Sequence, residues 1–288
     1  SREGAGPTRN GGSGMRGSRI RRLAASIGCV LLIAATAAPV VAATCTYSFP
    51  AGGGTLAKLE PGQTACGSPG DDYIVEMNGG TFLGRAGSDQ VEEQRGGRFY
   101  GGPGKDYVAW QYAGVFVGAR GTDEIWHQYG TFYAGAGHDY VHYVHAGLYV
   151  GGIGRDTVYD WQSGGRFIGG PGNDFSRGME GGVFRGGPGY DRAAHVSGRG
   201  VFHGGAGGDT AHRLYDNGRF YGGRGADTAA YVTSGAVFNG ARGEDRITGW
   251  LHDATFHGGR ARDSAVIADC STTVVLTGVE DQSVINVC

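Results

Sequence analysis

Twelve aspartates recur at nearly constant spacing and are the residues of this chain best suited to chemistry. Each closes a glycine-rich loop, seen most clearly as Gly-Gly-Pro-Gly-Asn-Asp at residues 169–174, and successive aspartates lie 16 to 18 positions apart. Carboxylates beside the exposed carbonyl oxygens of tight glycine turns form an all-oxygen ligand set, which suits Ca²⁺. We call these residues the aspartate column: Asp72, Asp89, Asp106, Asp123, Asp139, Asp156, Asp174, Asp191, Asp209, Asp227, Asp245 and Asp263.

The short period indicates the elements that must position these side chains. A repeat of 16 to 18 residues held across residues 67–266 is typical of a solenoid. Each repeat is predicted to form a turn, a short strand, a second turn and a second strand. We therefore predict an all-β protein: a parallel β-solenoid (β-roll) of about 12 coils of 17–18 residues.

Two apolar positions in each repeat are predicted to fill a narrow core between two parallel sheets. One lies two residues after the aspartate and the other in the second half of the repeat. The first set is Ile74, Val91, Val108, Ile125, Val141, Val158, Ser176, Ala193, Ala211, Ala229, Ile247 and Ala265. The second set is Phe82, Phe99, Phe116, Phe132, Tyr149, Phe167, Phe184, Phe202, Phe220, Phe238 and Phe256.

Composition supports a packed repeat array. The 288 residues include 60 Gly but only 8 Pro, and the glycines do not follow a strict Gly-X-Y repeat, which excludes collagen. Hydrophobic residues make up 40% of the chain and fall at a fixed phase of the repeat, which a disordered linker has no reason to show.

The first 43 residues are predicted to lie outside the fold. Met15 precedes a basic segment, an apolar run from Leu23 to Val41 and small residues suited to signal-peptidase cleavage. We expect a cleaved signal and a secreted, extracellular chain without stable membrane insertion. A retained membrane anchor and lipidation at Cys45 are the alternatives. Residues 44–66 and 267–288 are expected to cap the two ends of the solenoid at 67–266.

Cysteine positions and charge agree with export. After the signal, two cysteines precede the first aspartate loop and two follow the last, so we predict disulfides Cys45–Cys66 and Cys270–Cys288. The other pairings would join opposite ends of a rod, which is too far for a disulfide. Removing residues 1–43 from the 25 basic and 27 acidic residues leaves a clearly acidic chain, so nucleic acid is not an expected partner. We expect a monomer.

Stacking would place the column's carboxylates about 5 Å apart. Charges at that distance repel, and the repulsion grows as water is removed, so the column requires neutralisation. The loops resemble the RTX, or haemolysin-type, calcium-binding repeat, G-G-x-G-x-D-x-U-x, over residues 67 to about 266. The resemblance implies a β-roll with Ca²⁺ held between stacked loops by these aspartates and by loop glycines: Gly101, Gly104, Gly169, Gly172, Gly186, Gly189, Gly204 and Gly207.

The chain departs from that pattern in two ways. Only one edge of each coil carries an aspartate, and several loops replace glycine with Arg85, Ala119, Ala134, Ala241 or Ala261. Basic residues also enter the loops, which allows an alternative in which Arg–Asp pairs take the place of calcium. These basic residues are Lys105, Arg120, Arg155, Arg224, Arg242, Arg260 and Arg262.

Aromatic and histidine residues gather in repeats three to six, on the side expected to face away from the loops. A row of rings can stack on sugars or dock a cell-surface partner, or it can simply shield the second turn. The candidate ligand edge is Trp110, Tyr112, Trp126, Tyr129, Tyr143 and Trp161.

Catalytic signatures are absent from the sequence, so no enzyme activity is expected. A polysaccharide lyase or epimerase is the least favoured alternative, because the coils carry no loop insertions. The predicted role is that of a calcium-stabilised extracellular rod with a structural or adhesive function; the alternative is a carbohydrate- or partner-binding solenoid.

Overall fold

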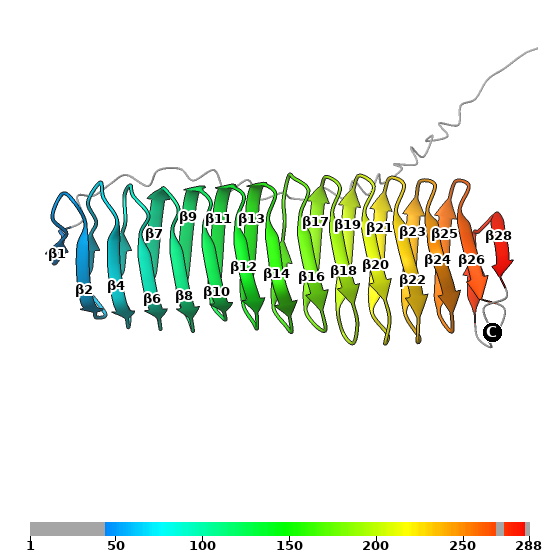
Figure 1. Ribbon diagram of the computed structural model, residues 1–288, viewed down its shortest axis with the longest axis horizontal. Helices are drawn as coiled ribbons and strands as arrows, with labels where there is room; N and C mark the ends of the chain where they lie inside the picture. Colours follow the sequence, from blue (N-terminus) through cyan, green and yellow to red (C-terminus); the bar gives the residue numbers. More distant parts are fainter. Residues whose placement is uncertain (1–43, 269–273, 286–288) are drawn as a thin grey trace, which may run out of the picture. The chain divides into compact units, whose positions relative to one another are not determined.

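The computed structural model describes residues 44–268 and 274–285, and this part of the chain is a parallel β-solenoid without a helix. Its strands belong to two fourteen-stranded sheets, and consecutive strands alternate between the sheets (Figure 1). Each coil therefore contributes one strand to each sheet. The predicted fold class is confirmed, and the strand stack continues past the aspartate repeats at both ends.

The first sheet contains the odd-numbered strands. They are β1 (Tyr47–Ser48), β3 (Thr64–Cys66), β5 (Thr81–Leu83), β7 (Arg98–Pro103), β9 (Val115–Gly121), β11 (Thr131–Gly137), β13 (Leu148–Gly154), β15 (Arg166–Ile168), β17 (Val183–Pro188), β19 (Val201–Ala206), β21 (Arg219–Arg224), β23 (Val237–Arg242), β25 (Thr255–Arg260) and β27 (Val275–Thr277).

The second sheet contains the even-numbered strands. They are β2 (Gly54–Leu59), β4 (Asp72–Met77), β6 (Gln90–Gln94), β8 (Tyr107–Gln111), β10 (Glu124–Gln128), β12 (Tyr140–Val144), β14 (Thr157–Gln162), β16 (Phe175–Met179), β18 (Arg192–Val196), β20 (Thr210–Leu214), β22 (Thr228–Thr233), β24 (Arg246–His252), β26 (Ser264–Ala268) and β28 (Asp281–Ile285).

An aromatic stack runs through the odd-numbered sheet's inner face. From Phe82 to Phe256 every ring is fully buried, and neighbouring rings stack with centroids 4.5–5.2 Å apart and planes within 13° of parallel. Because parallel strands lie about 4.8 Å apart, rings in register meet at contact distance without any adjustment of the backbone. The predicted aromatic set is confirmed as core.

The predicted aliphatic set faces the rings from the even-numbered sheet and is buried throughout, from Ile74 to Ala265. A third inner column lies five or six residues after most aspartates. The sequence did not predict it. It contains Met77, Gln94, Gln111, Gln128, Val144, Gln162, Met179, Val196, Leu214, Val232 and Leu251, all fully buried.

The third column compensates for changes in the aliphatic one. Where the aliphatic set has large residues, as at Val108, the third column mostly carries glutamine, as at Gln111. Where the aliphatic set shrinks to alanine, as at Ala211, the third column carries residues such as Leu214. The glutamines also join the sheets: Gln111 Nε2 donates to the carbonyl of Thr131 at 3.1 Å.

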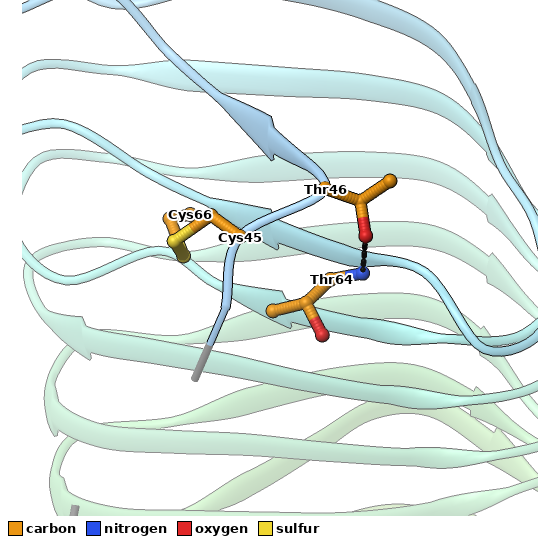
Figure 2. The surroundings of a disulfide bond; sticks show 4 residues. All are labelled: Cys45, Thr46, Thr64 and Cys66. Carbon is orange, nitrogen blue, oxygen red and sulfur yellow. Dashed lines mark hydrogen bonds between the residues drawn. A yellow bond between two sulfur atoms is a disulfide. The ribbon is translucent and has the colours of Figure 1, made fainter. Parts of the chain in front are cut away.

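The N-terminal end of the solenoid is closed covalently. Cys45 and Cys66 form a disulfide with Cα atoms 5.7 Å apart, and the backbone N–H of Thr64 donates to Thr46 Oγ1 at 3.1 Å beside it (Figure 2). This predicted pair is confirmed. Cys270 and Cys288 lie outside the described residues, as does the predicted signal segment at 1–43. Across residues 44–268 and 274–285, no helix is long and apolar enough to cross a membrane.

Candidate metal centre

The aspartate column forms a continuous hydrogen-bonded line just inside the turn that leads into the even-numbered sheet. The backbone N–H of each aspartate donates to Oδ1 of the aspartate one coil further on, at 2.7–3.0 Å, through eleven consecutive steps from Asp72 to Asp263. All twelve side chains are buried, with at most 1% of their surface exposed. The sequence located the line correctly but did not predict its complete burial.

Both ends of the line are closed by residues that the sequence reading missed. At the C-terminal end, the N–H of Asp263 donates to Glu280 Oε2 at 2.7 Å, so a glutamate takes the place of a thirteenth aspartate. At the N-terminal end, the N–H of Ser68 donates to Asp72 Oδ2 at 2.6 Å. Glu280 lies 17 residues after Asp263, and this spacing was the available signal.

The second carboxylate oxygen has no comparable partner. From Asp89 to Asp263, the Oδ2 atom of every column residue is buried and accepts no hydrogen bond. A buried acceptor without a partner costs about 1–3 kcal/mol. Eleven such atoms in one line are therefore the feature of this fold that most requires a compensating species.

In every coil but one, the first glycine of the loop leaves room for that oxygen. A Cβ atom built on Gly101 would overlap Asp106 Oδ2, and one on Gly169 would overlap Asp174 Oδ2. Beside Gly84, Asp89 Oδ2 and the carbonyl oxygen of Gly101 both border the same space. Gly186 and Gly204 stand in the same relation to Asp191 and Asp209.

The glycine at the fourth position of each loop serves the stacking of coils. A Cβ atom on Gly172 would overlap the carbonyl oxygen of Gly154 one coil earlier, and Gly104, Gly189 and Gly207 are equally confined by the preceding coil. The glycines that the resemblance suggested as ligands thus have a steric role in the fold, whether or not their carbonyls bind an ion.

One coil lacks the glycine beside its aspartate. Ala134 is fully buried where the other coils have glycine, and Asp139, which closes this loop, follows Asp123 after a spacing of 16 residues. The Ala134 methyl group stands at the position where, in the neighbouring coils of Gly118 and Gly151, a Cβ atom would overlap the aspartate Oδ2. The other substitutions expected to disturb the loops, Arg85, Ala119, Ala241 and Ala261, adopt positive φ angles of 78–124°, a conformation in which a side chain is strained.

Removal from water raises the pKa values of the column aspartates from Asp89 to Asp263, and the backbone hydrogen bond to each of these carboxylates only partly offsets this. The pKa is about 8 for Asp123 and Asp156 and about 6 for Asp139. It is about 7 for Asp89, Asp106, Asp174, Asp191, Asp209, Asp227 and Asp245, and the pKa of Asp263 is also raised. At neutral pH, the column carboxyl groups with a pKa of about 7 are therefore close to half protonated and half ionised.

Basic loop residues do not neutralise the column. Among the ion pairs formed within residues 44–268 and 274–285, none joins a column aspartate to a lysine or arginine. Lys105 instead pairs with Glu124, and Arg262 with Asp281. The described part of the chain also contains no group of three His, Cys, Asp or Glu side chains that could hold a metal ion. A cation in the column would therefore need backbone carbonyl oxygens as well as carboxylates.

The candidate aromatic edge is assembled, but mostly on a sheet face. Trp110, Trp126, Tyr143 and Trp161 lie on β8, β10, β12 and β14, while Tyr112 and Tyr129 follow β8 and β10 at the second turn. The rings stack on one another along the solenoid: Trp110 on His127 at 3.8 Å, and Tyr112 on Tyr129 at 6.4 Å between centroids. Most of these rings therefore stack against a neighbouring ring, but Trp110, Tyr112, Trp126, Tyr129 and Trp161 remain exposed.

A charged chain crosses the same face. Glu124 Oε1 lies 3.1 Å from His142 Nε2, and His142 Nδ1 lies 3.3 Å from Asp160 Oδ2. Lys105 and Arg177 extend the chain at its two ends. These contacts cross five coils and join the loop before β8 to β10, β12, β14 and β16 at their outer surface.

The fold and the column together define a parallel β-solenoid with a buried, stacked carboxylate line. No family model, curated protein or solved structure matches the chain.

Proposed function

We propose that this chain is a secreted calcium-binding β-roll protein with a structural or adhesive extracellular role, without enzymatic activity. The observation that carries the proposal is the line of eleven buried Oδ2 atoms without hydrogen-bond partners. A divalent cation that bound beside them would neutralise charge and occupy the free lone pairs in one step.

The donor set supports a hard cation. A carboxylate oxygen is the nearest atom beside most of the first loop glycines, and at Gly84 the Asp89 carboxylate and the Gly101 carbonyl converge. Ca²⁺ accepts carboxylate and carbonyl oxygens in irregular geometry, whereas Mg²⁺ demands near-ideal octahedra and keeps its water. The residues that would hold calcium are the column aspartates together with carbonyls of the loop glycines. The coil of Ala134 should bind most weakly.

Protons are the competing species, since pKa values of about 7 allow part of the column to be neutral without a metal. Neutralisation by protons and neutralisation by a bound cation differ in their pH dependence. Above about pH 8 the carboxyl protons are lost, so only a bound cation can then neutralise the column.

Extracellular location is supported by the Cys45–Cys66 disulfide, because such bonds persist in oxidising compartments. The structural role is supported by the aromatic rings, whose stacking extends along the solenoid as a ladder. The stacking of the rings on one another favours the structural role over the carbohydrate-binding alternative on this face.

The test is thermal unfolding of residues 44–288 followed by far-UV circular dichroism at about pH 8.5, where the column should be mostly ionised. We expect the unfolding temperature to rise with Ca²⁺ and to fall with EDTA, and an equal concentration of Mg²⁺ to have a much smaller effect. Equal unfolding temperatures in Ca²⁺ and in EDTA would refute the proposal and leave protons as the neutralising species.

A further inference from the structure

Three arginines form a second column on the outside of the C-terminal coils. Arg224, Arg242 and Arg260 end β21, β23 and β25 and pair in direct register across the sheet. All three are exposed. Neighbouring strands lie about 4.8 Å apart, so the three side chains start at that spacing along the solenoid axis. We call them the arginine column.

The arginine column has no acidic partner among the ion pairs of the described residues, unlike Arg95, Arg177 and Arg262. Glu244, two residues after Arg242, is the nearest acidic loop residue in sequence outside the aspartate column. Its charge helps to raise the pKa of Arg262, although the main cause of that rise is the hydrogen bond from Arg262 to Asp281. Aspartates 227, 245 and 263 are buried and hydrogen-bond along their own column. The three guanidinium groups therefore present unmatched positive charge.

The fold does not require these arginines. Like charges directly opposite each other on adjacent strands are destabilising. At the equivalent position, strands earlier in the solenoid carry Pro103, Arg120, Ala136, Ile153, Pro188 and Ala206, so only one of these six is charged. Three consecutive arginines thus place like charges side by side at a position where the earlier strands mostly carry uncharged residues.

The surface beside the arginine column carries only small side chains, with a line of polar residues beyond them. Gly223, Ala241 and Gly259 precede the arginines in register and carry nothing larger than a methyl group. Beyond this strip, Tyr221, Asn239 and His257 form a third register line with hydrogen-bonding tips. An extended chain that lies along the strip would have cations on one side and groups able to bond hydroxyls on the other.

Charge is distributed unevenly along the solenoid. Outside the aspartate column, residues 161–263 contain twelve arginines and four acidic residues, whereas residues 67–160 contain six basic and six acidic residues. The C-terminal half is therefore the end that attracts an anionic polymer.

We propose that the arginine column binds a linear acidic polysaccharide, with successive carboxylate or sulfate groups on successive guanidinium groups. Arginine suits this because its planar fork binds either group in a bidentate manner. A polysaccharide is favoured over nucleic acid because nucleic-acid affinity depends on neutralising many phosphates, and only three unpaired cations stand in line here. The sugar hydroxyls also match the polar line of Tyr221, Asn239 and His257.

The experiment measures binding of residues 44–288 to immobilised polygalacturonate and to dextran sulfate, with neutral dextran and single-stranded DNA in parallel. The test variant is Arg224→Gln/Arg242→Gln/Arg260→Gln. The matched control, Arg98→Gln/Arg166→Gln/Arg185→Gln, removes the same charge from exposed positions of the same sheet whose register partners are not arginines. Circular dichroism and the unfolding temperature of each variant establish that it is folded.

We expect at least about a tenfold loss of affinity in the test variant, the effect of losing one charge-assisted hydrogen bond or more, and less than about a twofold loss in the control. Binding to only one of the two acidic polymers would identify the group that the column takes. Equal losses in the two variants, no binding of the unmodified chain to either acidic polymer, or equally tight binding to single-stranded DNA would each overturn the proposal.

Discussion

The backbone N–H of Asp106 donates a 2.9 Å hydrogen bond to Oδ1 of Asp123, one coil further along the solenoid. Repeated at every coil, this bond joins each turn to the next and fixes one oxygen of each carboxylate. The other oxygen remains buried and unpaired. The column therefore stabilises the stack through its Oδ1 atoms and destabilises it through its charge.

That balance predicts an unusual pH dependence for the metal-free chain. Burial raises the pKa of Asp106 and Asp174 to about 7, above the value of about 3.9 for an unfolded aspartate. A raised folded-state pKa means that the native state binds protons more tightly, so this contribution is complete below about pH 4 and is lost as pH rises through about 6 to 8. In EDTA, the urea midpoint should fall between about pH 5 and pH 9. A midpoint that rises over this range would show that the column is not protonated in the native state.

Substitutions of Asp174 distinguish the roles of its two carboxylate oxygens. Asp174→Asn keeps an acceptor for the N–H of Asp156, now at 2.8 Å from Oδ1, and removes the buried charge. In EDTA at about pH 8.5 it should be at least as stable as the unmodified chain, whereas Asp174→Ala should lose about 1–3 kcal/mol because the amide is left unpaired. Urea unfolding measures both. Equal destabilisation by Asn and Ala would argue against a charged, partly unsatisfied carboxylate; exposed Asp216→Asn is the control.

Gly169→Ala tests the space beside the carboxylate. The new methyl group would collide with the Asp174 side chain, so we expect a loss of about 1–3 kcal/mol on urea unfolding. Gly52→Ala is the matched control, since a Cβ atom there meets nothing within 4 Å. A neutral Gly169→Ala would mean that the loop relaxes and that the glycine is not sterically required.

Ser176 is predicted to be a site of stabilisation. It interrupts the aliphatic column between Val158 and Ala193, and its buried Oγ has no hydrogen-bond partner. Ser176→Ala should raise stability by about 1 kcal/mol, because it removes an unpaired hydroxyl while matching the residue of the next coil. Ser197→Ala should not do so, since Ser197 Oγ donates to the carbonyl of Met179 at 3.4 Å. The unfolding temperatures of the two variants test this prediction. A rise in unfolding temperature for Ser197→Ala alone would contradict it.

Periodicity alone was enough to predict the solenoid, the Phe82–Phe256 stack and the alignment of Asp72 with Asp263. Residues at a fixed phase of a repeat must share a column once the coils stack, whatever the details of the turns. The Cys45–Cys66 pair followed from the same geometry, because only cysteines at one end of a rod can meet.

The direction of each side chain depended on the tertiary structure. Nothing in the spacing shows that the Asp106 carboxylate turns inward against Gly101, or that Gln111 reaches the carbonyl of Thr131, since both outcomes depend on the turn's backbone angles. The strand register was also needed to show that Glu280 lies one coil beyond Asp263 and that Arg224, Arg242 and Arg260 lie in one line. Which residues share a column follows from the period of the sequence, because stacked coils align equal phases. Which columns are buried, paired or exposed depends on the folded turns, because each turn orients its own side chains.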